Sequence, residues 1–301
     1  MKKIAVTGSH GLIGSALVPF LEKRGYAVVR IVRSTANDPA PGSTVEWNIE
    51  QGRIQGDGLN NCEAVVHLAG ANIANARWTA QYKRMILDSR VKSTRLLARA
   101  LAELRDPPKV FICASAVGYY GNHALGISVD ENTPAADDFL AQVCRQWEEA
   151  AAPLKEKGIR VAHLRMGVVL SRAGGALAKM LPAFQLGLGG TLGNGSQIMS
   201  WVALDEVPAV VEHIVQDPKI SGGVNVVSPR SVSNREFTRV LGEVLHRPTV
   251  FPVPGFALRL VLGEMADALL LGGARVVPKK LTDAGYSFRC PDLKTALEKS
   301  P

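Results

Sequence analysis

The chain has 301 residues, of which 47% are hydrophobic and 21% charged, a balance typical of a folded globular protein with one large or two modest domains. Its 35 Lys and Arg residues outnumber its 27 acidic residues, which gives a formal net charge of +8. The basic residues are spread along the chain without a long block of like charge. This pattern favours small anionic ligands, such as phosphates, over nucleic acid.

The sequence predicts neither a membrane span nor secretion. An apolar strand begins at Lys3, which leaves no room for a signal peptide. The most apolar later segment, 256–274, is interrupted by Arg259, Glu264 and Asp267. We therefore expect a cytoplasmic protein without membrane contact. We also expect no metal site and no disulfide, because no paired spacing is found among Cys62, Cys113, Cys144 and Cys290.

Short β-branched segments alternate with helical periodicity through the first two thirds of the chain. The predicted helices include Leu12–Arg24 and Thr79–Leu104. This alternation predicts an α/β fold with a doubly wound parallel sheet of the Rossmann type. The predicted strands are Lys3–Thr7, Ala27–Val32, Ala64–Leu68, Lys109–Ala114 and Arg160–Arg165.

The alternation loosens beyond Arg165, where we expect a smaller substrate lobe, mainly 170–222 and 228–247. This region includes the glycine-rich segment Gly187–Gly195 and one further strand, Val224–Val227. Three prolines then predict a boundary near residue 248. The expected domains are a dinucleotide-binding domain over 1–247 and a small C-terminal domain over 248–301, with an apolar helix around Leu258–Leu271.

The run Val6–Gly14 carries the clearest functional signal, with glycines at 8, 11 and 14 between a strand and a helix. Gly8 permits a tight turn, Gly11 lets the backbone approach a pyrophosphate, and Gly14 lets the helix pack on the strand. Free amides at the start of the helix favour the diphosphate. We expect the contacts of this turn to come from Gly8, His10, Gly11, Leu12, Ile13 and Gly14.

The second strand ends in Arg33 and Ser34, where an acidic residue would bind the ribose hydroxyls of NAD. A guanidinium and a hydroxyl suit a 2′-phosphate instead, so we predict NADP(H) as the cofactor. A third strand ends in Leu68, Ala69 and Gly70, whose small side chains let a cofactor lie against the backbone.

Two arginines are further candidates for ligand contact. Arg90 leans toward the apolar stripe of its helix, so its charge needs a partner, which is substrate, a cofactor phosphate or a structural carboxylate. Arg165 ends a strand at the edge where open α/β folds bind ligands, and a structural ion pair is the alternative.

Several segments resemble the extended short-chain dehydrogenase/reductases, and more narrowly an atypical NAD-dependent epimerase/dehydratase-like "epimerase family protein" group that has a small C-terminal domain. The segments that carry this resemblance are Arg77–Trp78, Asp88–Thr94, Ser115–Gly121, Asp138–Ala141 with Trp147–Glu148, Met199–Val202, Gly263–Asp267, Val277–Leu281 and Gly285–Phe288.

The resemblance implies that the catalytic Ser/Thr–Tyr–Lys set of the superfamily is missing. Aligned on the resembling segments, Ala116 takes the Ser/Thr position, with Ser115 one residue early. Leu140 and Cys144 take the positions of the tyrosine and the lysine. The remaining candidates for proton transfer or catalysis are Ser115, Tyr119, Tyr120 and Arg90.

The sequence therefore predicts an NADP(H)-binding oxidoreductase or epimerase-like protein. Its substrate would be an unknown polar small molecule, with nucleotide sugars as one candidate class. The alternative is a non-catalytic protein that senses NADP(H) and acts through a partner. The sequence leaves the substrate, the direction of hydride transfer and a homodimer open.

Overall fold

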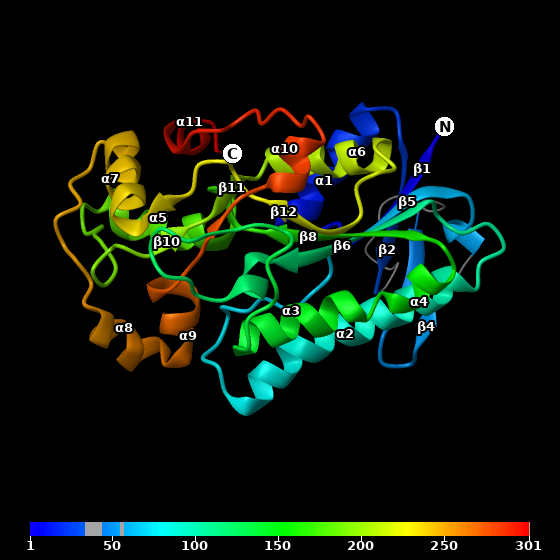
Figure 1. The fold of residues 1–301 in the computed structure, drawn as a ribbon, viewed down its shortest axis with the longest axis horizontal. Helices are drawn as coiled ribbons and strands as arrows, with labels where there is room; N and C mark the ends of the chain where they lie inside the picture. Colours follow the sequence, from blue (N-terminus) through cyan, green and yellow to red (C-terminus); the bar gives the residue numbers. More distant parts are fainter. Residues whose placement is uncertain (34–43, 55–56, 301) are drawn as a thin grey trace.

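The computed structural model describes residues 1–33, 44–54 and 57–300, and an eight-stranded sheet runs through its centre (Figure 1). The strand order is β12-β8-β6-β5-β1-β2-β3-β4. Only the β3–β4 pair is antiparallel. The strands are β1 (Lys3–Thr7), β2 (Ala27–Val32), β3 (Thr44–Asn48), β4 (Arg53–Ile54), β5 (Cys62–His67), β6 (Val110–Ala116), β8 (Arg160–Met166) and β12 (Gly222–Val226).

The predicted doubly wound sheet is confirmed. All six predicted strands are present, and their ends differ from the predicted ones by at most two residues. The chain moves outward from β1 to β3 and then crosses to β5 on the other side of β1. The change of direction therefore lies between β1 and β5, where such folds bind ligands. Strands β3 and β4, at one end of the strand order, were not among the predicted strands.

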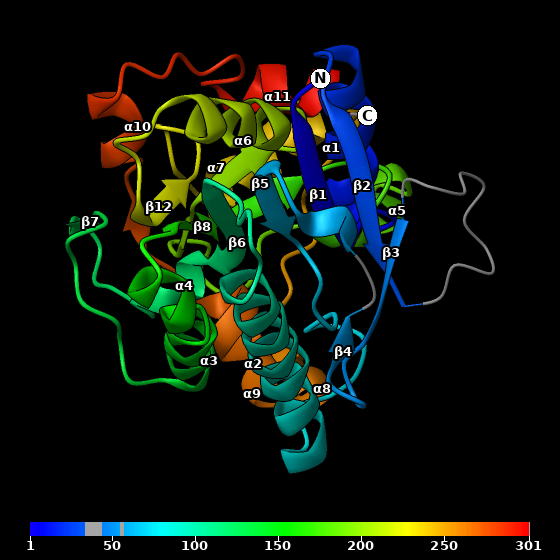
Figure 2. The same cartoon turned by 90° about the vertical axis from the view of Figure 1, so that its right-hand side faces the viewer.

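Helices cover both faces of the sheet (Figures 1 and 2). On one face, α1 (Leu12–Lys23) and α6 (Glu206–Gln216) bury apolar side chains against the strands. The opposite face is covered by α2 (Ala80–Ala102), α3 (Phe139–Glu149) and α4 (Ala152–Glu156). Among the described residues, no helix combines the length and the apolar character needed to cross a bilayer.

A second group of short elements extends beyond one end of the sheet (Figure 1). Its apolar core gathers around Trp201, Phe184 and Phe237, which are nearly inaccessible to solvent. These elements are β9 (Val168–Leu170), α5 (Gly175–Gln185), β10 (Ile198–Met199), β11 (Trp201–Ala203), β13 (Val232–Ser233) and α7 (Asn234–Leu245). Other short elements are the 3-10 helices η1 (Asp57–Leu59) and η2 (Val117–Tyr120) and strand β7 (Ser128–Val129), whose Val129 shares an apolar cluster with Tyr120.

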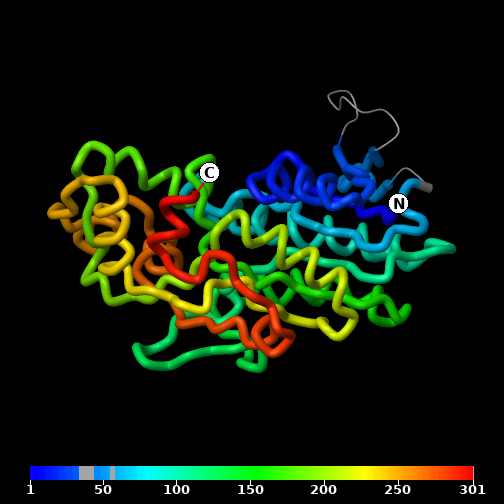
Figure 3. The backbone as a smooth tube through the Cα atoms, turned by 90° about the horizontal axis from the view of Figure 1, so that it is seen from above, coloured from blue at the N-terminus to red at the C-terminus, as the bar shows by residue number. Residues whose placement is uncertain are grey.

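The C-terminal segment spreads along the molecule, as the orange-to-red tube in Figure 3 shows. The predicted single helix around 258–271 is wrong, because the chain turns at Gly263, whose φ is +63°. Residues of this segment contribute to cores shared with earlier elements, and the proposed division at residue 248 stays a prediction. Its elements are α8 (Gly255–Leu262), α9 (Glu264–Ala266), η3 (Asp267–Leu271), β14 (Arg275–Val276), α10 (Lys279–Asp283) and α11 (Leu293–Lys299).

Candidate functional site

The glycine turn between β1 and α1 leaves no space for side chains at two positions. A Cβ on Gly8 would lie 2.9 Å from the carbonyl carbon of Leu68, and the φ of Gly8 is +65°. A Cβ on Gly14 would lie 2.2 Å from the carbonyl oxygen of Gly8. The predicted reasons for Gly8 and Gly14 therefore match the geometry: a tight turn and a close approach of helix to strand.

The first turn of α1 has no capping side chain. Its N-cap residue is Gly11, and no acidic residue lies in the first turn. In contrast, Thr79, Asp138 and Ser233 each cap their helices by accepting a hydrogen bond from a backbone amide. The amino end of α1 therefore combines amides that have no partner within the helix, including those of Leu12 and Ile13, with the positive end of the helix dipole. His10 is exposed beside this turn.

The end of β5 is held to β1 by a buried hydrogen-bond network. The Thr7 hydroxyl accepts hydrogen bonds from the amides of Leu68 and Ala69, at 3.0 and 3.2 Å. It lies 2.7 Å from His67 Nδ1, and His67 Nε2 lies 3.2 Å from the Ser93 hydroxyl. Burial lowers the pKa of His67 to about 3, so the ring is neutral. This network fixes the backbone that leads into Gly70.

The remaining residues predicted at the cofactor site lie in two places, after β2 and on α2. Arg33 directly follows β2 and is exposed, whereas Ser34 lies outside the described residues. Arg90, on α2, lies along Gly70, because a Cβ on that glycine would be 3.5 Å from Arg90 Cζ. The guanidinium also lies 5.0 Å from the centre of the Trp147 ring. The structure thus brings Arg90 to the end of β5.

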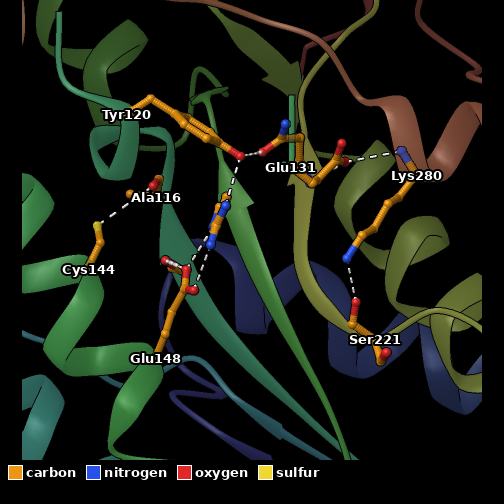
Figure 4. Close-up of polar contacts among 10 residues, drawn as sticks. Ala116, Tyr120, Glu131, Cys144, Glu148, Ser221 and Lys280 are labelled. Atoms are coloured by element: carbon orange, nitrogen blue, oxygen red, sulfur yellow. Dashed lines mark hydrogen bonds and ion pairs between the residues drawn. The ribbon is translucent and has the colours of Figure 1, made fainter. Parts of the chain in front are cut away.

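The third predicted arginine, Arg165, lies in a buried polar network with Glu148 and Tyr120, the two partners that Figure 4 labels. Its guanidinium donates two hydrogen bonds to the Glu148 carboxylate, both 2.9 Å long, and a third of 2.9 Å to the Tyr120 hydroxyl. Arg165 is only 5% exposed. This geometry is the structural ion pair that the sequence analysis held as its alternative.

Register explains how this network forms. Ser115, Arg165 and Asn225 occupy one row across β6, β8 and β12, so their side chains share one face of the sheet. The Ser115 hydroxyl donates to Glu148 at 2.8 Å, and the Tyr120 hydroxyl donates to Asn225 at 2.7 Å. Two catalytic candidates, Ser115 and Tyr120, are therefore engaged inside the protein and are 2% and 1% exposed.

The charges of this network reinforce one another. Burial alone raises the pKa of Glu148, but the hydrogen bonds and charge of Arg165, together with His163 and the Ser115 hydroxyl, outweigh it and hold that pKa below its ordinary value. Burial raises the pKa of Tyr120 to about 12, even though the nearby Arg165 lowers it. At neutral pH the network therefore contains an ion pair and a neutral phenol. Tyr119 is half-buried, with its ring 3.4 Å below the Arg165 guanidinium carbon.

The positions that correspond to the tyrosine and lysine of the superfamily face the end of β6. Leu140 lies beside Gly118, where an added Cβ would be 3.2 Å from Leu140 Cβ. The Cys144 thiol donates to the carbonyl of Ala116 at 3.6 Å. Burial raises the pKa of Cys144 to about 11, so it is a neutral thiol. Neither side chain provides the proton donor or the cation found in catalytic relatives.

Some residues of the site escaped the sequence analysis. Asn225 was not singled out, and Glu148 was noticed only as part of a resembling segment. Ser89 accepts a hydrogen bond from the Ala71 amide at 3.1 Å, and Ser93 bonds to His67. The spacing of these two serines, one turn apart on α2, was the available signal. Among the described residues, no three His, Cys, Asp or Glu side chains gather as metal ligands.

Comparisons with known proteins agree with this geometry. The sequence pattern described as the NAD dependent epimerase/dehydratase family matches residues 4–227, and a domain of unknown function, DUF1731, matches residues 253–300. Epimerase family protein Mb2239 of Mycobacterium bovis is 42% identical over 294 residues, covering 98% of this chain and 96% of the relative. Human epimerase family protein SDR39U1 is 35% identical over 299 residues, covering 98% of both.

A crystal structure of human SDR39U1 (isoform 2) with NADPH superposes with a TM-score of 0.90 at 34% identity. The match covers 99% of this chain and 98% of that one. The resemblance predicted from the sequence motifs is therefore confirmed, including the C-terminal segment. The chain belongs to the NAD-dependent epimerase/dehydratase family, in the group of epimerase family proteins related to SDR39U1.

Proposed function

We propose that this protein binds NADP(H) at the carboxyl edge of its sheet and acts as an oxidoreductase or epimerase-like enzyme on a polar substrate. The observation that carries the proposal is the uncapped amino end of α1 beside a turn that a Cβ would fill. A diphosphate satisfies such amides without a side-chain cap. The human relative crystallised with NADPH supports the choice of cofactor.

Each part of the site has a role in this proposal. The amides at Leu12 and Ile13 bind the diphosphate, and Arg33 binds the 2′-phosphate through its planar guanidinium. The backbone at Ala69 and Gly70 lies along the cofactor, with the Thr7 network holding it in place. When bound, NADP(H) supplies the hydride, and the chain positions it.

We assign Ser115, Tyr120 and Arg165 to the support of the site rather than to its chemistry. Ser115 and Arg165 both bond to Glu148, Arg165 also donates to the Tyr120 hydroxyl, and none of the three is more than 5% exposed. Tyr119 is the tyrosine candidate that remains, since its side chain is only half-buried at the same end of the sheet. Proton transfer would then use Tyr119 or water.

The second candidate function is a non-catalytic NADP(H) sensor that acts through a partner. The buried, neutral Cys144 thiol and the apolar Leu140 favour it, because they replace the usual proton-transfer pair. Oxidation of NADPH with a panel of sugar nucleotides, aldehydes and ketones separates the two functions. Turnover with any class supports the enzyme, whereas tight NADPH binding without turnover on the whole panel supports the sensor.

Cofactor choice is tested by titrating the protein with NADPH and NADH while following nicotinamide fluorescence. NADPH should bind about tenfold tighter or more, and Arg33→Asp should remove that preference, because the 2′-phosphate loses its charged partner. Arg105→Asp is the matched control, because Arg105 is exposed and precedes β6 at the opposite edge of the sheet. Equal preference in the Arg33→Asp variant and the parent protein would refute the role of Arg33.

A further inference from the structure

Arg90 carries a half-buried positive charge that no acidic group neutralises in the part of the chain that the structure describes. Among the described residues, no carboxylate lies within ion-pair distance of its guanidinium. One amino group donates to the carbonyl of Ile86, one turn earlier in α2, at 3.0 Å. The buried Arg165, in contrast, is fully engaged by Glu148 and Tyr120.

The position of Arg90 is held by its neighbours on both sides. Ser89 and Ser93, next to it in α2, bond to Ala71 and His67 at the end of β5. The Trp147 ring of α3 lies 5.0 Å from the guanidinium carbon. The guanidinium is therefore oriented by an aromatic face and a backbone carbonyl, and both leave part of its donor edge available.

An unpaired, partly desolvated cation needs a reason, because its burial costs free energy that no partner returns. Burial lowers the pKa of Arg90, with no nearby carboxylate to oppose that effect. The structural carboxylate, one of the three partners considered from the sequence, is therefore absent among the described residues. An anion of the ligand is the partner that remains.

The position of Arg90 distinguishes a substrate anion from a cofactor phosphate. In the proposed function, the diphosphate lies at the amino end of α1 and the 2′-phosphate lies at Arg33, so the phosphates of the cofactor have other donors. Arg90 instead lies along Gly70 at the end of β5, beside Trp147 of α3, the helix whose Cys144 bonds to Ala116 at the end of β6.

We propose that Arg90 is the binding site for an oxyanion of the substrate, a carboxylate or a phosphate group, held between Gly70 and Trp147. This inference rests on the proposed function, because it requires NADP(H) to occupy the rest of the edge. It assigns the substrate to the class of anionic molecules. Arg90 thus contributes to substrate specificity and takes no part in proton transfer.

The test uses the full-length protein saturated with NADP⁺ and titrated calorimetrically with sodium oxalate or with inorganic phosphate at constant ionic strength. At least one probe should bind with a dissociation constant below about 50 mM, and Arg90→Gln should weaken it about tenfold or more. Arg90→Lys should recover part of the affinity, because it keeps the charge but loses the planar fork. Arg95→Gln, an exposed arginine on the same helix, is the matched control.

Three results would overturn the inference: neither probe binds, Arg90→Gln binds both probes as the parent does, or Arg90→Gln weakens NADPH more than the probes. The last result would assign the guanidinium to the cofactor. Repeating the titrations without NADP⁺ separates this inference from the proposed function. If the protein does not bind NADP(H), the proposed function fails, whereas the dependence of probe binding on Arg90 still decides the oxyanion site.

Discussion

Replacing Glu148 by Gln should destabilise the fold strongly, because it leaves the Arg165 charge buried without a counter-charge. The side chains of the two residues are 12% and 6% exposed, and two hydrogen bonds of 2.9 Å join them. Removing one partner of such a buried pair costs about 3–5 kcal/mol. Gln keeps one acceptor oxygen, so we expect a loss near the lower limit, about 3 kcal/mol.

The assay is urea unfolding followed by tryptophan fluorescence, with Glu149→Gln as the control. Glu149 is the next residue of α3 but is exposed, so its substitution should change the free energy of unfolding by less than about 0.5 kcal/mol. Arg165→Met and the double variant complete a double-mutant cycle, in which we expect a coupling of about 2–3 kcal/mol. A loss below about 1 kcal/mol for Glu148→Gln, or no coupling, would refute this account of the network.

The same variants test the assignment of Arg165 to structural support. Arg165→Met should change the affinity for NADPH by less than about threefold, provided that the variant is folded at the temperature of the assay. A larger loss of cofactor affinity, with the fold intact by circular dichroism, would restore Arg165 as a cofactor ligand.

Two further predictions concern stability and the C-terminal segment. Burial lowers the pKa of His67 to about 3 and that of His163 to about 4, so both rings stay neutral in the fold and gain protons below pH 6.5 only on unfolding. The free energy of unfolding should therefore be unaffected by these rings above pH 6.5 and should fall by about 1.4 kcal/mol per pH unit for each ring as the pH is lowered from 6.5 toward 4. An unchanged urea midpoint between pH 6.5 and 5 would contradict this. Glu206, 2% exposed, accepts hydrogen bonds from the Tyr286 hydroxyl and the Arg289 amide and so holds the C-terminal segment against α6. Glu206→Gln should therefore speed tryptic cleavage after Arg289 several-fold, whereas substitution of the exposed Glu156 by Gln should not. Equal cleavage of both variants would argue against this role of Glu206.

The parallel sheet could be predicted because each central strand can be recognised from its own residues. Each central strand is a short apolar run, and Gly8 and Gly14 occur where a side chain would collide with backbone. The edge strands β3 and β4 could not be predicted in the same way. Strand β3 carries Glu46 and ends at the exposed Asn48, and β4 has only two residues. Such strands depend on pairing with a neighbour rather than on their own sequence.

The contacts of the candidate side chains were less predictable, because they depend on the register between strands that are distant in the sequence. Ser115 lies one residue before the usual catalytic position, and a shift of one residue in a strand moves a side chain to the opposite face. It therefore joins Arg165 and Asn225 on the face covered by α3. Nothing near Ser115 in the sequence indicates that Asn225, 110 residues later, occupies the same row of the sheet on the other side of Arg165.

The different states of the two arginines follow from adjacent residues of α3. Glu148 binds Arg165 with both carboxylate oxygens and also accepts the Ser115 hydroxyl, so three of its roughly four acceptor positions are already occupied. Trp147, one residue earlier, offers Arg90 only the face of its ring. Helix α3 thus neutralises one cation and leaves the charge of the other uncompensated. Because the uncompensated cation is the one that lies along Gly70 at the end of β5, charge is available to a ligand at the edge where we propose that NADP(H) binds.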